Sequence, residues 1–450
     1  MDDCIAAISS AVGQAGIGIV RMSGEGSFDV LDRVFDKDIS KIENKKMTYG
    51  HIIDRGNIID EVMVSAMKEP YTYTREDVVE IYTHGGMMSV KKVLELLLRS
   101  GARLAEPGEF TKRAFLNGRL DLTQAEAVID IIHAKTDKAH QLSVNQLSGS
   151  LKGLVKEYRD KLLDILSHVE YNINFTEDMQ EEPDDSMLIV DAKEVRDKLS
   201  KLLSTANKGK ILRDGVNTVI IGKPNVGKSS LLNALLKENR AIVTDVPGTT
   251  RDVIEEYIDL DGLALKISDT AGIRDTDDIV EKIGVEKSVS FIDNADLVIA
   301  IFDSSRELDK EDMRIIDLIK DKRAIILLNK SDLDKKLDFD LDLGDIPIIE
   351  TSIKEGKGIE ELEETILRLF NSGDLEVSND VLVSNVRQQE ILNRAYDSLN
   401  SAISDMERGV PSDCYEVDLR SAWEILGEIT GETIEDDILD KIFSDFCIGK

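Results

Sequence analysis

Short apolar runs separated by glycine-containing turns characterise the first third of the chain. Runs of this length are typical of strands, and they lie at Gly18–Met22, Glu61–Met67 and Val78–Tyr82. Apolar residues at helical spacing near Val90–Arg99, with a glycine soon after, predict one helix. Residues 1–118 are therefore predicted to form an α+β domain.

The period changes from residue 119 to residue 211, where apolar positions recur mostly at helical spacing. Thr123 followed by Glu126 matches a capping box at the start of a helix. The acidic stretch Glu177–Asp185 breaks the pattern, and a second helix is predicted near Ala192–Ala206. We therefore expect a helical bundle segment here. Its apolar positions are Ile129, Ile132, Leu142, Leu147, Leu151, Leu154, Leu162, Leu163, Leu166 and Val169.

Residues 212–371 alternate apolar strands with helices, which favours a mainly parallel sheet covered on both faces. Long amphipathic helices return from 372 to 450. We expect an α/β domain inserted into a helical domain whose two halves are 119–211 and 372–450. The predicted strands of the inserted domain are Val216–Ile221, Val253–Leu260, Leu263–Ser268, Leu297–Phe302, Ala324–Leu328 and Pro347–Glu350.

A phosphate-binding pattern, G-x-x-x-x-G-K-[ST], lies at Gly222–Ser229 between a predicted strand and a predicted helix. Its glycines let the backbone curl so that N–H groups point at phosphate oxygens, and the helix N-terminus favours anions. Lys228 is expected to reach the β- and γ-phosphates, and the Ser229 hydroxyl to ligate Mg²⁺. The segment predicts a nucleoside triphosphate site.

A second motif, Asn329-Lys330-Ser331-Asp332, follows a strongly apolar strand. A carboxylate at Asp332 can accept the two N–H groups of guanine at N1 and N2, whereas adenine offers no such pair. Asn329 is expected to serve the N7/O6 edge and brace the loop, and Thr351–Lys354 to close the base pocket. The motif therefore favours GTP over ATP, which disfavours an adenine-nucleotide enzyme.

Two further segments have the character of nucleotide-sensing loops. In Asp269–Gly272, Asp269 would hold Mg²⁺ through water and the last N–H would sense the γ-phosphate. In Gly248–Asp252, Thr250 can complete the Mg²⁺ shell when the γ-phosphate is present. Ras-like switches orient the attacking water with a glutamine after D-x-x-G, but Ile273 occupies that position here.

The formal net charge of −32, from 88 acidic and 56 basic residues, argues against non-specific coating of nucleic acid. Three scattered cysteines, Cys4, Cys414 and Cys447, suit neither a disulfide framework nor a cysteine zinc site, and a reducing cytoplasm is expected. No apolar run is long enough to predict a membrane span. A local basic groove is still compatible with Lys91, Lys92, Arg99, Arg103, Lys112, Arg113 and Arg119.

Taken with these motifs, the chain resembles the MnmE (TrmE) family of tRNA-modifying GTPases over essentially its full length. The resemblance implies a multidomain protein. Residues 1–118 would be a tetrahydrofolate-binding-like dimerisation domain, 119–211 and 372–450 a discontinuous α-helical domain, and 212–371 an inserted α/β Ras-like phosphate-loop GTPase domain. The segments that carry the resemblance are Pro107–Thr111, Arg113–Leu122, Gln124–Ala127, Gly222–Ser230, Asp245–Asp252, Asp269–Gly272 and Phe446–Lys450.

The resemblance also implies an activity. With an FAD-containing partner, MnmG, the family adds an aminomethyl or carboxymethylaminomethyl group at C5 of the wobble uridine in certain tRNAs. The one-carbon unit is carried by 5-formyltetrahydrofolate or a related tetrahydrofolate. A cytoplasmic homodimer that forms a heterotetramer with MnmG is implied, together with GTP, Mg²⁺ and K⁺.

Motif matching to the family places the folate site on four charged residues: Arg21, Glu80, Arg119 and Lys450. Cys447, close to the C-terminus, is a candidate thiol for the tRNA modification, and a buried or idle thiol is the alternative.

The family replaces the missing glutamine and an arginine finger with K⁺, bound when two GTPase domains pair. The match assigns K⁺ ligation to Asn225, Thr244, Val246 and Thr249, and it assigns orientation of the attacking water to Glu281 as the catalytic residue. Motifs and resemblance together assign to GTP the residues Asn225, Val226, Gly227, Lys228, Ser229, Ser230, Thr244, Asp245, Val246, Pro247, Gly248, Thr249, Thr250, Asp269, Thr270, Ala271, Gly272, Asn329, Lys330, Asp332, Ser352, Ile353 and Lys354.

Two positions depart from the family pattern. Arg75 stands where the family usually has glycine, which is expected to alter a loop near the folate site, and Arg119 stands where some relatives have lysine. The alternative function is a regulatory GTPase that acts through partner or ribosome binding. Such a switch needs neither a folate-like N-terminal domain nor the residues Cys447–Lys450.

Overall fold

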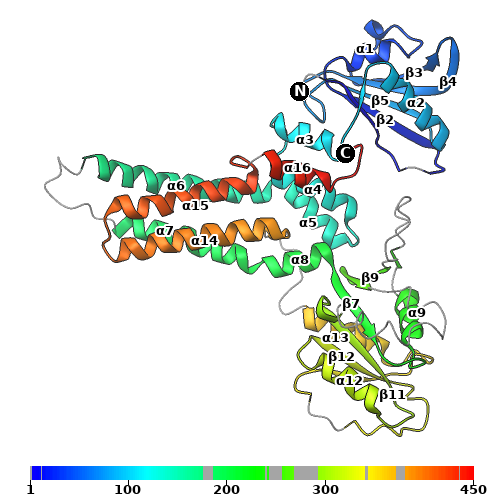
Figure 1. The fold of residues 1–450 in the computed structure, drawn as a ribbon, viewed down its shortest axis with the longest axis vertical. Helices are drawn as coiled ribbons and strands as arrows, with labels where there is room; N and C mark the ends of the chain where they lie inside the picture. The colour runs from blue at the N-terminus through cyan, green and yellow to red at the C-terminus, as the bar shows by residue number, and fades with distance from the viewer. Residues whose placement is uncertain are drawn as a thin grey trace. The chain divides into compact units, whose positions relative to one another are not determined.

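The computed structural model divides into two compact units, each assembled from segments far apart in the sequence. Unit 1 combines Met1–Ile129, Asn145–Lys201 and Glu390–Lys450, and unit 2 combines Asp130–Val144 and Leu202–Gln389. Figure 1 shows both ends of the chain, coloured blue and red, within unit 1. The described residues are 3–11, 13–175, 186–238, 241–242, 256–267, 292–339, 343–370, 381–434 and 436–450. Within these ranges, no helix is both long and apolar enough to cross a membrane.

A six-stranded sheet with the order β3-β4-β5-β2-β1-β6 forms the N-terminal part of unit 1. The elements are β1 (Ile5–Ile8), β2 (Ile17–Ser23), α1 (Ser27–Asp32), the 3-10 turn η1 (Ile39–Lys41), β3 (Met47–Asp54), β4 (Asn57–Met67), β5 (Val78–His84), α2 (Met87–Arg99), β6 (Arg103–Leu104) and α3 (Glu109–Leu116). Val20 and Met22 of β2 enter the core that α1 and α2 cover. Because strand side chains alternate, Arg21 lies on the other face of the sheet.

The three strands predicted for this region are confirmed as β2, β4 and β5, and the helix as α2, which begins three residues earlier at Met87. β1, β3 and β6 were not predicted. In β1, Ile5, Ala6 and Ala7 are all fully buried, so the strand has no alternation of apolar and polar residues to reveal it.

Long helices make up the rest of unit 1, and some of them continue into unit 2. They are α4 (Leu122–His133), α5 (Asp137–Leu147), α6 (Ser150–Phe175), α7 (Ser186–Ser204), α14 (Val386–Glu407), α15 (Ser412–Thr430) and α16 (Asp436–Ser444). α6 and α15 pack side by side (Figure 1). Val155, Leu162 and Val169 of α6 are buried at seven-residue intervals, which is the spacing of a bundle seam. The helical period predicted for these segments is confirmed.

The predicted capping box of α4 is wrong in its register. Asp121, not Thr123, caps the helix: its carboxylate accepts the Gln124 N–H at 3.0 Å, and the Gln124 side chain accepts the Asp121 N–H at 3.1 Å. Thr123 lies inside the helix and donates its hydroxyl to Asp121. The tetrads Asp121–Gln124 and Thr123–Glu126 both match the capping pattern. The helix begins at Leu122, which is buried together with Ala125, so Asp121 is the residue at the cap.

A seven-stranded sheet with the order β13-β12-β11-β7-β10-β9-β8 forms the centre of unit 2 (Figure 1). The strands from β13 to β10 are parallel, and β9 and β8 continue the sheet antiparallel. The sheet and its helices are, in chain order, α8 (Ala206–Asp214), β7 (Val216–Ile221), α9 (Lys228–Glu238), β8 (Ala241–Ile242), β9 (Glu256–Leu260), β10 (Leu263–Ile267), β11 (Leu297–Asp303), α12 (Lys310–Ile319), β12 (Ala324–Asn329), β13 (Ile348–Glu350) and α13 (Ile359–Phe370).

The predicted, mainly parallel sheet is confirmed. β11 and β12 are buried along their whole length, as expected of strands with helices on both faces. Each of the six predicted strands corresponds to a strand, with ends that differ by at most three residues where they are described. Residues 253–255 and 268 lie outside the described residues. The two-residue strand β8 was not predicted because it is too short to show a period.

The last residues of the chain pack on the N-terminal sheet inside unit 1. Ile448 forms an antiparallel bridge with Pro107, and the Gly108 N–H donates to the Cys447 carbonyl at 3.3 Å. The Ser9 hydroxyl donates to the Gly449 carbonyl at 3.0 Å. A side chain at Gly449 would lie 2.1 Å from the Ile8 carbonyl oxygen, so only glycine fits there. The tail therefore packs against the end of β1 and the start of α3.

Candidate functional site

The phosphate loop connects β7 to α9 at the carboxyl end of the parallel sheet. Its backbone takes positive φ values at Gly222 (152°), Asn225 (62°) and Gly227 (113°). A Cβ at Gly222 would lie 2.6 Å from the Ile301 carbonyl oxygen, and one at Gly227 would lie 2.4 Å from the Asn329 side-chain nitrogen. Both glycines are therefore required by close contacts with the neighbouring strands as well as by backbone conformation.

The lysine of the motif is hydrogen-bonded to the backbone of the phosphate loop itself. The Lys228 ammonium donates to the carbonyls of Gly222 and Lys223, each at 2.8 Å. Burial lowers the pKa of Lys228 below its ordinary value, because the site offers carbonyl dipoles but no carboxylate partner among the described residues. The charge is thus desolvated and directed across the curl of the loop, where phosphate oxygens would lie.

A second set of ion pairs joins the phosphate loop to α12. The Lys223 ammonium, 8% exposed, donates to Asp312 at 3.0 Å and also pairs with Asp309. Asp309 and Asp312 together form the capping box of α12. The position of Lys223 in the loop is therefore fixed by two carboxylates at one helix N-terminus, a contact that the motif alone does not reveal.

The base-recognition segment contacts the phosphate loop directly. The Asn329 side chain donates to the Val226 carbonyl at 2.7 Å and accepts the Ile353 N–H at 3.2 Å. The Ser352 hydroxyl donates to Asp332 at 2.8 Å. The structure thus brings together Asn329, Asp332, Ser352 and Ile353, as the predicted base pocket requires.

Lys330 points to a different partner. Its backbone is left-handed, with φ 66°, and its ammonium pairs at 2.6 Å with Asp303 at the end of β11. Burial alone would raise the pKa of Asp303, but hydrogen bonds from Lys330 and Ser305 hold it below its ordinary value. Ser229 and Ser230 lie in the first turn of α9, and Lys354 is exposed after β13.

Many of the predicted nucleotide and cation residues lie outside the described residues. For these positions the structure neither supports nor opposes the prediction. They are Thr244, Asp245, Val246, Pro247, Gly248, Thr249, Thr250, Asp269, Thr270, Ala271, Gly272 and Glu281.

A second candidate site lies in unit 1, on the face of the N-terminal sheet opposite α1 and α2. Arg21 and Glu80 are direct partners across β2 and β5, and their side chains form an ion pair at 2.8 Å. The other Glu80 oxygen accepts the Tyr82 hydroxyl at 2.6 Å, and burial together with this bond raises the pKa of Tyr82 to about 12. Arg21 also donates to the Gly449 carbonyl at 3.5 Å, which brings the C-terminal tail to the pair.

An aromatic wall adjoins this pair. The Arg21 guanidinium lies 5.7 Å from the Tyr73 ring centre and 5.6 Å from that of Phe110. The Arg119 guanidinium lies 4.6 Å from the Tyr73 ring centre, and the Tyr73 hydroxyl bonds to Thr111 at 2.9 Å. Three predicted folate residues, Arg21, Glu80 and Arg119, are thus brought together around Tyr73, which the sequence reasoning missed.

The signal that could have found Tyr73 is its place in Pro70–Asp77, the segment in which Arg75 departs from the family pattern. Lys450 follows Gly449 and is partly buried at the end of the docked tail. The thiol of Cys447 is exposed, so the alternative of a buried thiol is wrong. Phe110 and Tyr82 were also missed, because neither belongs to a charged motif.

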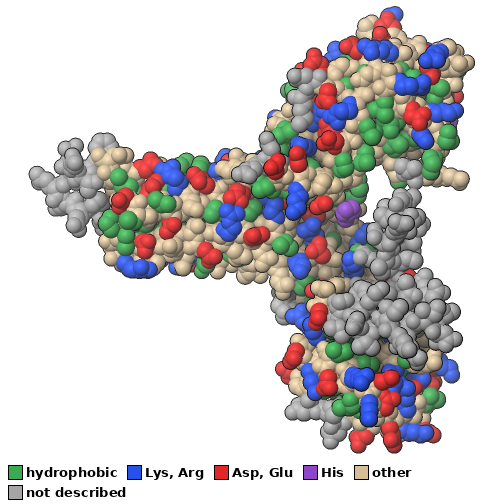
Figure 2. Space-filling view, viewed as in Figure 1, with side chains coloured by type: hydrophobic (Ala, Val, Ile, Leu, Met, Phe, Trp, Pro, Cys, Tyr) green, Lys and Arg blue, Asp and Glu red, His purple; other side chains and the backbone are tan. Residues whose placement is uncertain are grey.

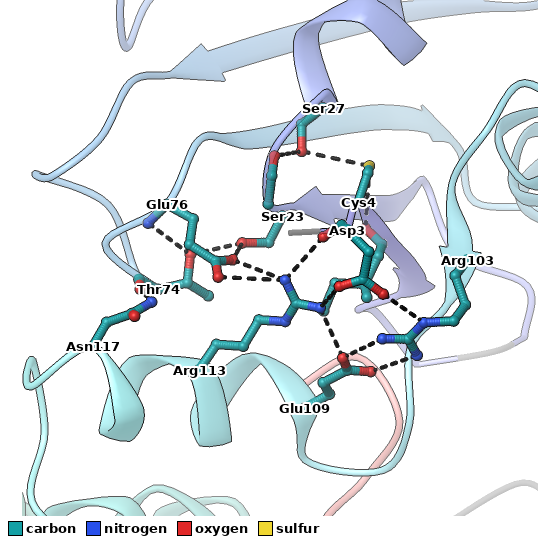
Figure 3. A network of polar contacts seen from close by, with 12 residues as sticks. Asp3, Cys4, Ser23, Ser27, Thr74, Glu76, Arg103, Glu109, Arg113 and Asn117 are labelled. Carbon is teal, nitrogen blue, oxygen red and sulfur yellow. Dashed lines mark hydrogen bonds and ion pairs between the residues drawn. The ribbon is translucent and has the colours of Figure 1, made fainter. Parts of the chain in front are cut away.

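A network of charges around the buried Arg113 reaches the loop that contains Tyr73 (Figure 3). Arg113, 1% exposed, donates to Asp3 at 2.6 Å, to Glu109 at 2.9 Å and to Glu76 at 3.3 Å. Arg103 donates to Glu109 at 2.6 Å. Burial alone would raise the pKa of Glu109, but the bonds from Arg103, a backbone N–H and Arg113 hold it below its ordinary value. The network joins α3 to the loop that contains Tyr73.

Arg75 lies at the surface of that loop. Its backbone is left-handed, with φ 60°, a conformation in which glycine is unstrained. Its guanidinium donates to the Asn117 carbonyl at 2.9 Å, while the Asn117 amide donates to the Thr74 carbonyl at 2.7 Å. At this position the arginine adds a contact to the α3–α4 connection.

The surface charges are mixed. Figure 2 shows lysine and arginine side chains interspersed with acidic ones on the face in view. The candidate sites therefore depend on local arrangements of charge within a strongly acidic chain.

The phosphate loop at the carboxyl end of a parallel sheet, with Asn329 braced against it, defines a phosphate-loop nucleotide-binding protein. The family model described as "MnmE helical domain" matches residues 122–447, and that described as "GTP-binding protein TrmE N-terminus" matches residues 4–119. The chain belongs to the MnmE family of tRNA modification GTPases.

Two relatives and one solved structure illustrate this similarity. The tRNA modification GTPase MnmE of Finegoldia magna is 69% identical, and that of Alkaliphilus metalliredigens is 53% identical; each alignment covers 100% of both chains. The G domain of the FeoB iron transporter of T. maritima is 29% identical over 34% of this chain and 97% of that chain, with a TM-score of 0.26.

Proposed function

We propose that this chain is a K⁺-activated GTPase that, with the FAD-containing partner MnmG, modifies C5 of the wobble uridine in certain tRNAs with a tetrahydrofolate one-carbon unit. The observation that carries the proposal is the presence of two separate built sites in one chain of this family. One is the phosphate loop with its base pocket, and the other is the Arg21–Glu80–Tyr73 site at the docked C-terminus.

The chain's own residues fit GTP. The desolvated Lys228 ammonium would exchange its two carbonyl acceptors for phosphate oxygens, and the exposed first turn of α9 offers Ser229 as a ligand for Mg²⁺. The Asp332 carboxylate, oriented by Ser352, would accept the guanine N1 and N2 donors. Asn329 holds the base and phosphate segments in register.

Hydrolysis needs a positioned water and a positive charge at the phosphates, which K⁺ would supply. Asn225 is exposed at the turn of the phosphate loop, so its amide oxygen is accessible to a cation there. The K⁺ roles of Thr244, Val246 and Thr249, and the orientation of water by Glu281, are carried by the family resemblance. A homodimer in which two GTPase domains pair belongs to this proposal.

The second site fits a tetrahydrofolate. Glu80 retains free lone pairs for the N–H donors of a pteridine, and the partly buried Tyr73 offers an aromatic face for its rings. Arg21, Arg119 and Lys450 supply positive charge for the glutamate carboxylates. Bound there, the folate would supply a one-carbon unit beside the docked tail, where the exposed Cys447 is the candidate thiol for the reaction with tRNA.

A regulatory switch is the second candidate. Such a protein needs only the nucleotide site, whereas this chain keeps a tail glycine at a position where any side chain would collide with Ile8, beside Arg21. The docking of the tail beside Arg21 and Glu80 favours chemistry in unit 1.

The test is nucleoside analysis of tRNA from cells that lack the gene, complemented by the wild type or by Lys228→Ala. The proposal predicts that the modified wobble uridine disappears on deletion and returns only with the wild type. An unchanged uridine profile after deletion would instead favour the regulatory switch.

A second measurement concerns K⁺. GTP turnover by the purified chain should rise sharply in KCl compared with NaCl at matched ionic strength. Equal rates in the two salts would remove Asn225 and the other assigned ligands from catalysis.

A further inference from the structure

Two guanidinium groups lie together at the rim of the Tyr73 wall. Arg119 stacks on the Tyr73 ring at 4.6 Å, and Arg75, two residues after Tyr73, donates to the carbonyl of Asn117 at 2.9 Å. The Arg75 nitrogen lies 3.5 Å from where a Cβ of Gly118 would be, and Gly118 immediately precedes Arg119. Arg75 and Arg119 are therefore attached to the same short turn, and both are exposed.

These two arginines differ from the others near the site in their partners. Arg21 is paired with Glu80, Arg103 with Asp3 and Glu109, and Arg113 with three carboxylates. Among the described residues, no carboxylate forms an ion pair with Arg75 or Arg119. In a chain with a net charge of −32, two uncompensated guanidiniums on one turn form a local positive site.

The next observation concerns the conformation and the contacts of Arg75. Arg75 adopts φ 60°, where a glycine is unstrained and an arginine is strained. Among the described residues its side chain bonds to one carbonyl, which leaves the other guanidinium N–H groups available for an anion. Arg75 therefore keeps unused guanidinium donors at the rim of the Tyr73 wall.

We propose that Arg75 and Arg119 form a subsite for the γ-linked glutamyl tail of a polyglutamylated tetrahydrofolate. This inference rests on the proposed folate site. With the pteridine ring at Glu80 and the aromatic wall, the glutamate tail leaves the site past Arg119 and reaches Arg75. Each added glutamate contributes one carboxylate, which a planar guanidinium can bind through two parallel hydrogen bonds.

Carboxylates fit better here than the phosphates of an RNA. Arg119 is held against the Tyr73 ring, on which Arg21 also lies, so its charge is beside the proposed folate site. An RNA-binding surface has to neutralise several phosphates, whereas this chain carries a net charge of −32.

The experiment compares equilibrium affinities of the full chain for monoglutamyl and triglutamyl 5-formyltetrahydrofolate by calorimetry. The wild type should bind the triglutamyl form about 3- to 10-fold more tightly, the gain expected of one or two solvent-exposed ion pairs. Arg75→Gly should remove most of that preference and leave the monoglutamyl affinity within about twofold. Raising the salt concentration should reduce the preference in the wild type.

Arg55→Gly is the matched control. Arg55 is also an exposed arginine with a left-handed backbone, φ 50°, in the turn between β3 and β4 of the same sheet. This control removes one charge and one strained residue without touching the rim, and it should leave the preference unchanged. Arg75→Lys should keep part of the preference, because it keeps the charge and loses the planar fork.

The outcomes separate the two proposals. If neither folate binds the wild type, the folate site itself is wrong. If both bind with equal affinity, or if Arg55→Gly lowers the preference as much as Arg75→Gly, the tail subsite is wrong and the folate site stands. If Arg75→Gly weakens tRNA binding and leaves the folate preference intact, the rim binds nucleic acid and the inference is overturned.

Discussion

The two candidate sites of this chain are built in different ways. The nucleotide site in unit 2 consists of short contiguous motifs at the ends of parallel strands, and their spacing along the chain already indicates their chemistry. The site in unit 1 brings together residues from β2, β5, the Tyr73 loop, the α3–α4 connection and the last residues of the chain. The first can therefore be recognised from sequence patterns, and the second only from the fold.

The difference extends to how each site is held. In unit 2 a buried lysine on the phosphate loop, Lys223, is tied to a helix cap, and the loop glycines are packed against neighbouring strands. In unit 1 the support is a buried network around Arg113 that joins α3 to the Tyr73 loop. We expect stability to depend most on the second network, because it holds more charges away from water.

The largest effect is expected at Arg113. Arg113→Met would remove the guanidinium shared by Asp3, Glu109 and Glu76; Glu109 would keep Arg103, but Glu76 would lose its cationic partner, and the free energy of unfolding should fall by about 3–5 kcal/mol. Denaturant unfolding of unit 1, followed by the fluorescence of Trp423 on α15, measures it. Lys112→Met is the control: the neighbouring Lys112 pairs with Asp440 at the surface, and its loss should cost less than about 1 kcal/mol. Equal losses of unfolding free energy in the two variants would mean that the Arg113 network stabilises the fold no more than a surface ion pair does.

The same network predicts a pH dependence. The pKa values of Asp3 and Glu109 in the folded chain lie below their ordinary values of 3.8 and 4.5, so their ionised forms stabilise the fold above those values. This stabilisation should be lost as the pH falls below about 4 through the folded pKa values. Unfolding measured from pH 6 to pH 3 should show a steeper loss for the wild type than for Arg113→Met. If the two proteins lose stability in parallel as the pH falls, the pH dependence does not arise from the contacts of Arg113.

The next effect concerns the nucleotide site alone. Lys228→Ala should lower GTP turnover by about 10²–10³, because it removes the desolvated charge directed at the phosphates. Folate affinity should be unchanged. Lys237→Ala, in the last turn of the same helix, is the control and should leave turnover near the wild-type rate. A fall in folate affinity with Lys228→Ala would show that the two sites are not independent.

A smaller effect is expected at the aromatic wall. Tyr73→Leu should weaken folate binding about tenfold, because the ring contacts of two guanidiniums and the Thr111 bond are lost. GTP turnover without folate should not change. Tyr71→Leu is the matched control, since Tyr71 is 81% exposed on the same loop. A similar loss in the control would assign the effect to the loop as a whole.

The smallest effect concerns backbone strain. Arg75→Gly should change the free energy of unfolding by less than about 1 kcal/mol, since relief of the left-handed conformation opposes the lost bond to Asn117 and the added freedom of the unfolded chain. Thermal unfolding of the variant beside Arg55→Gly measures the balance. A large destabilisation would mean that Arg75 is needed for folding, and its role at the rim would then need other support.

Much of the fold was predictable from periodicity. The alternation of β2, β4 and β5, the fully buried and mostly apolar β11 and β12 and the helical spacing of α6 each reflect burial that repeats along the chain. β1, β6 and β8 were not predictable, because they are short or buried on both faces. The register of the α4 cap was missed because two overlapping tetrads satisfy the same pattern, and only packing distinguishes them.

The sequence by itself determined the phosphate loop, the base-recognition motif and the strand–helix alternation, since each depends on residues close together in the chain. The tertiary structure alone decided that Tyr73 lies between Arg21 and Arg119, that Gly449 closes on Ile8, and that Lys223 is held by α12. These contacts join segments separated by tens to hundreds of residues. They form only when burial of the shared core brings those segments together, so no local pattern can encode them.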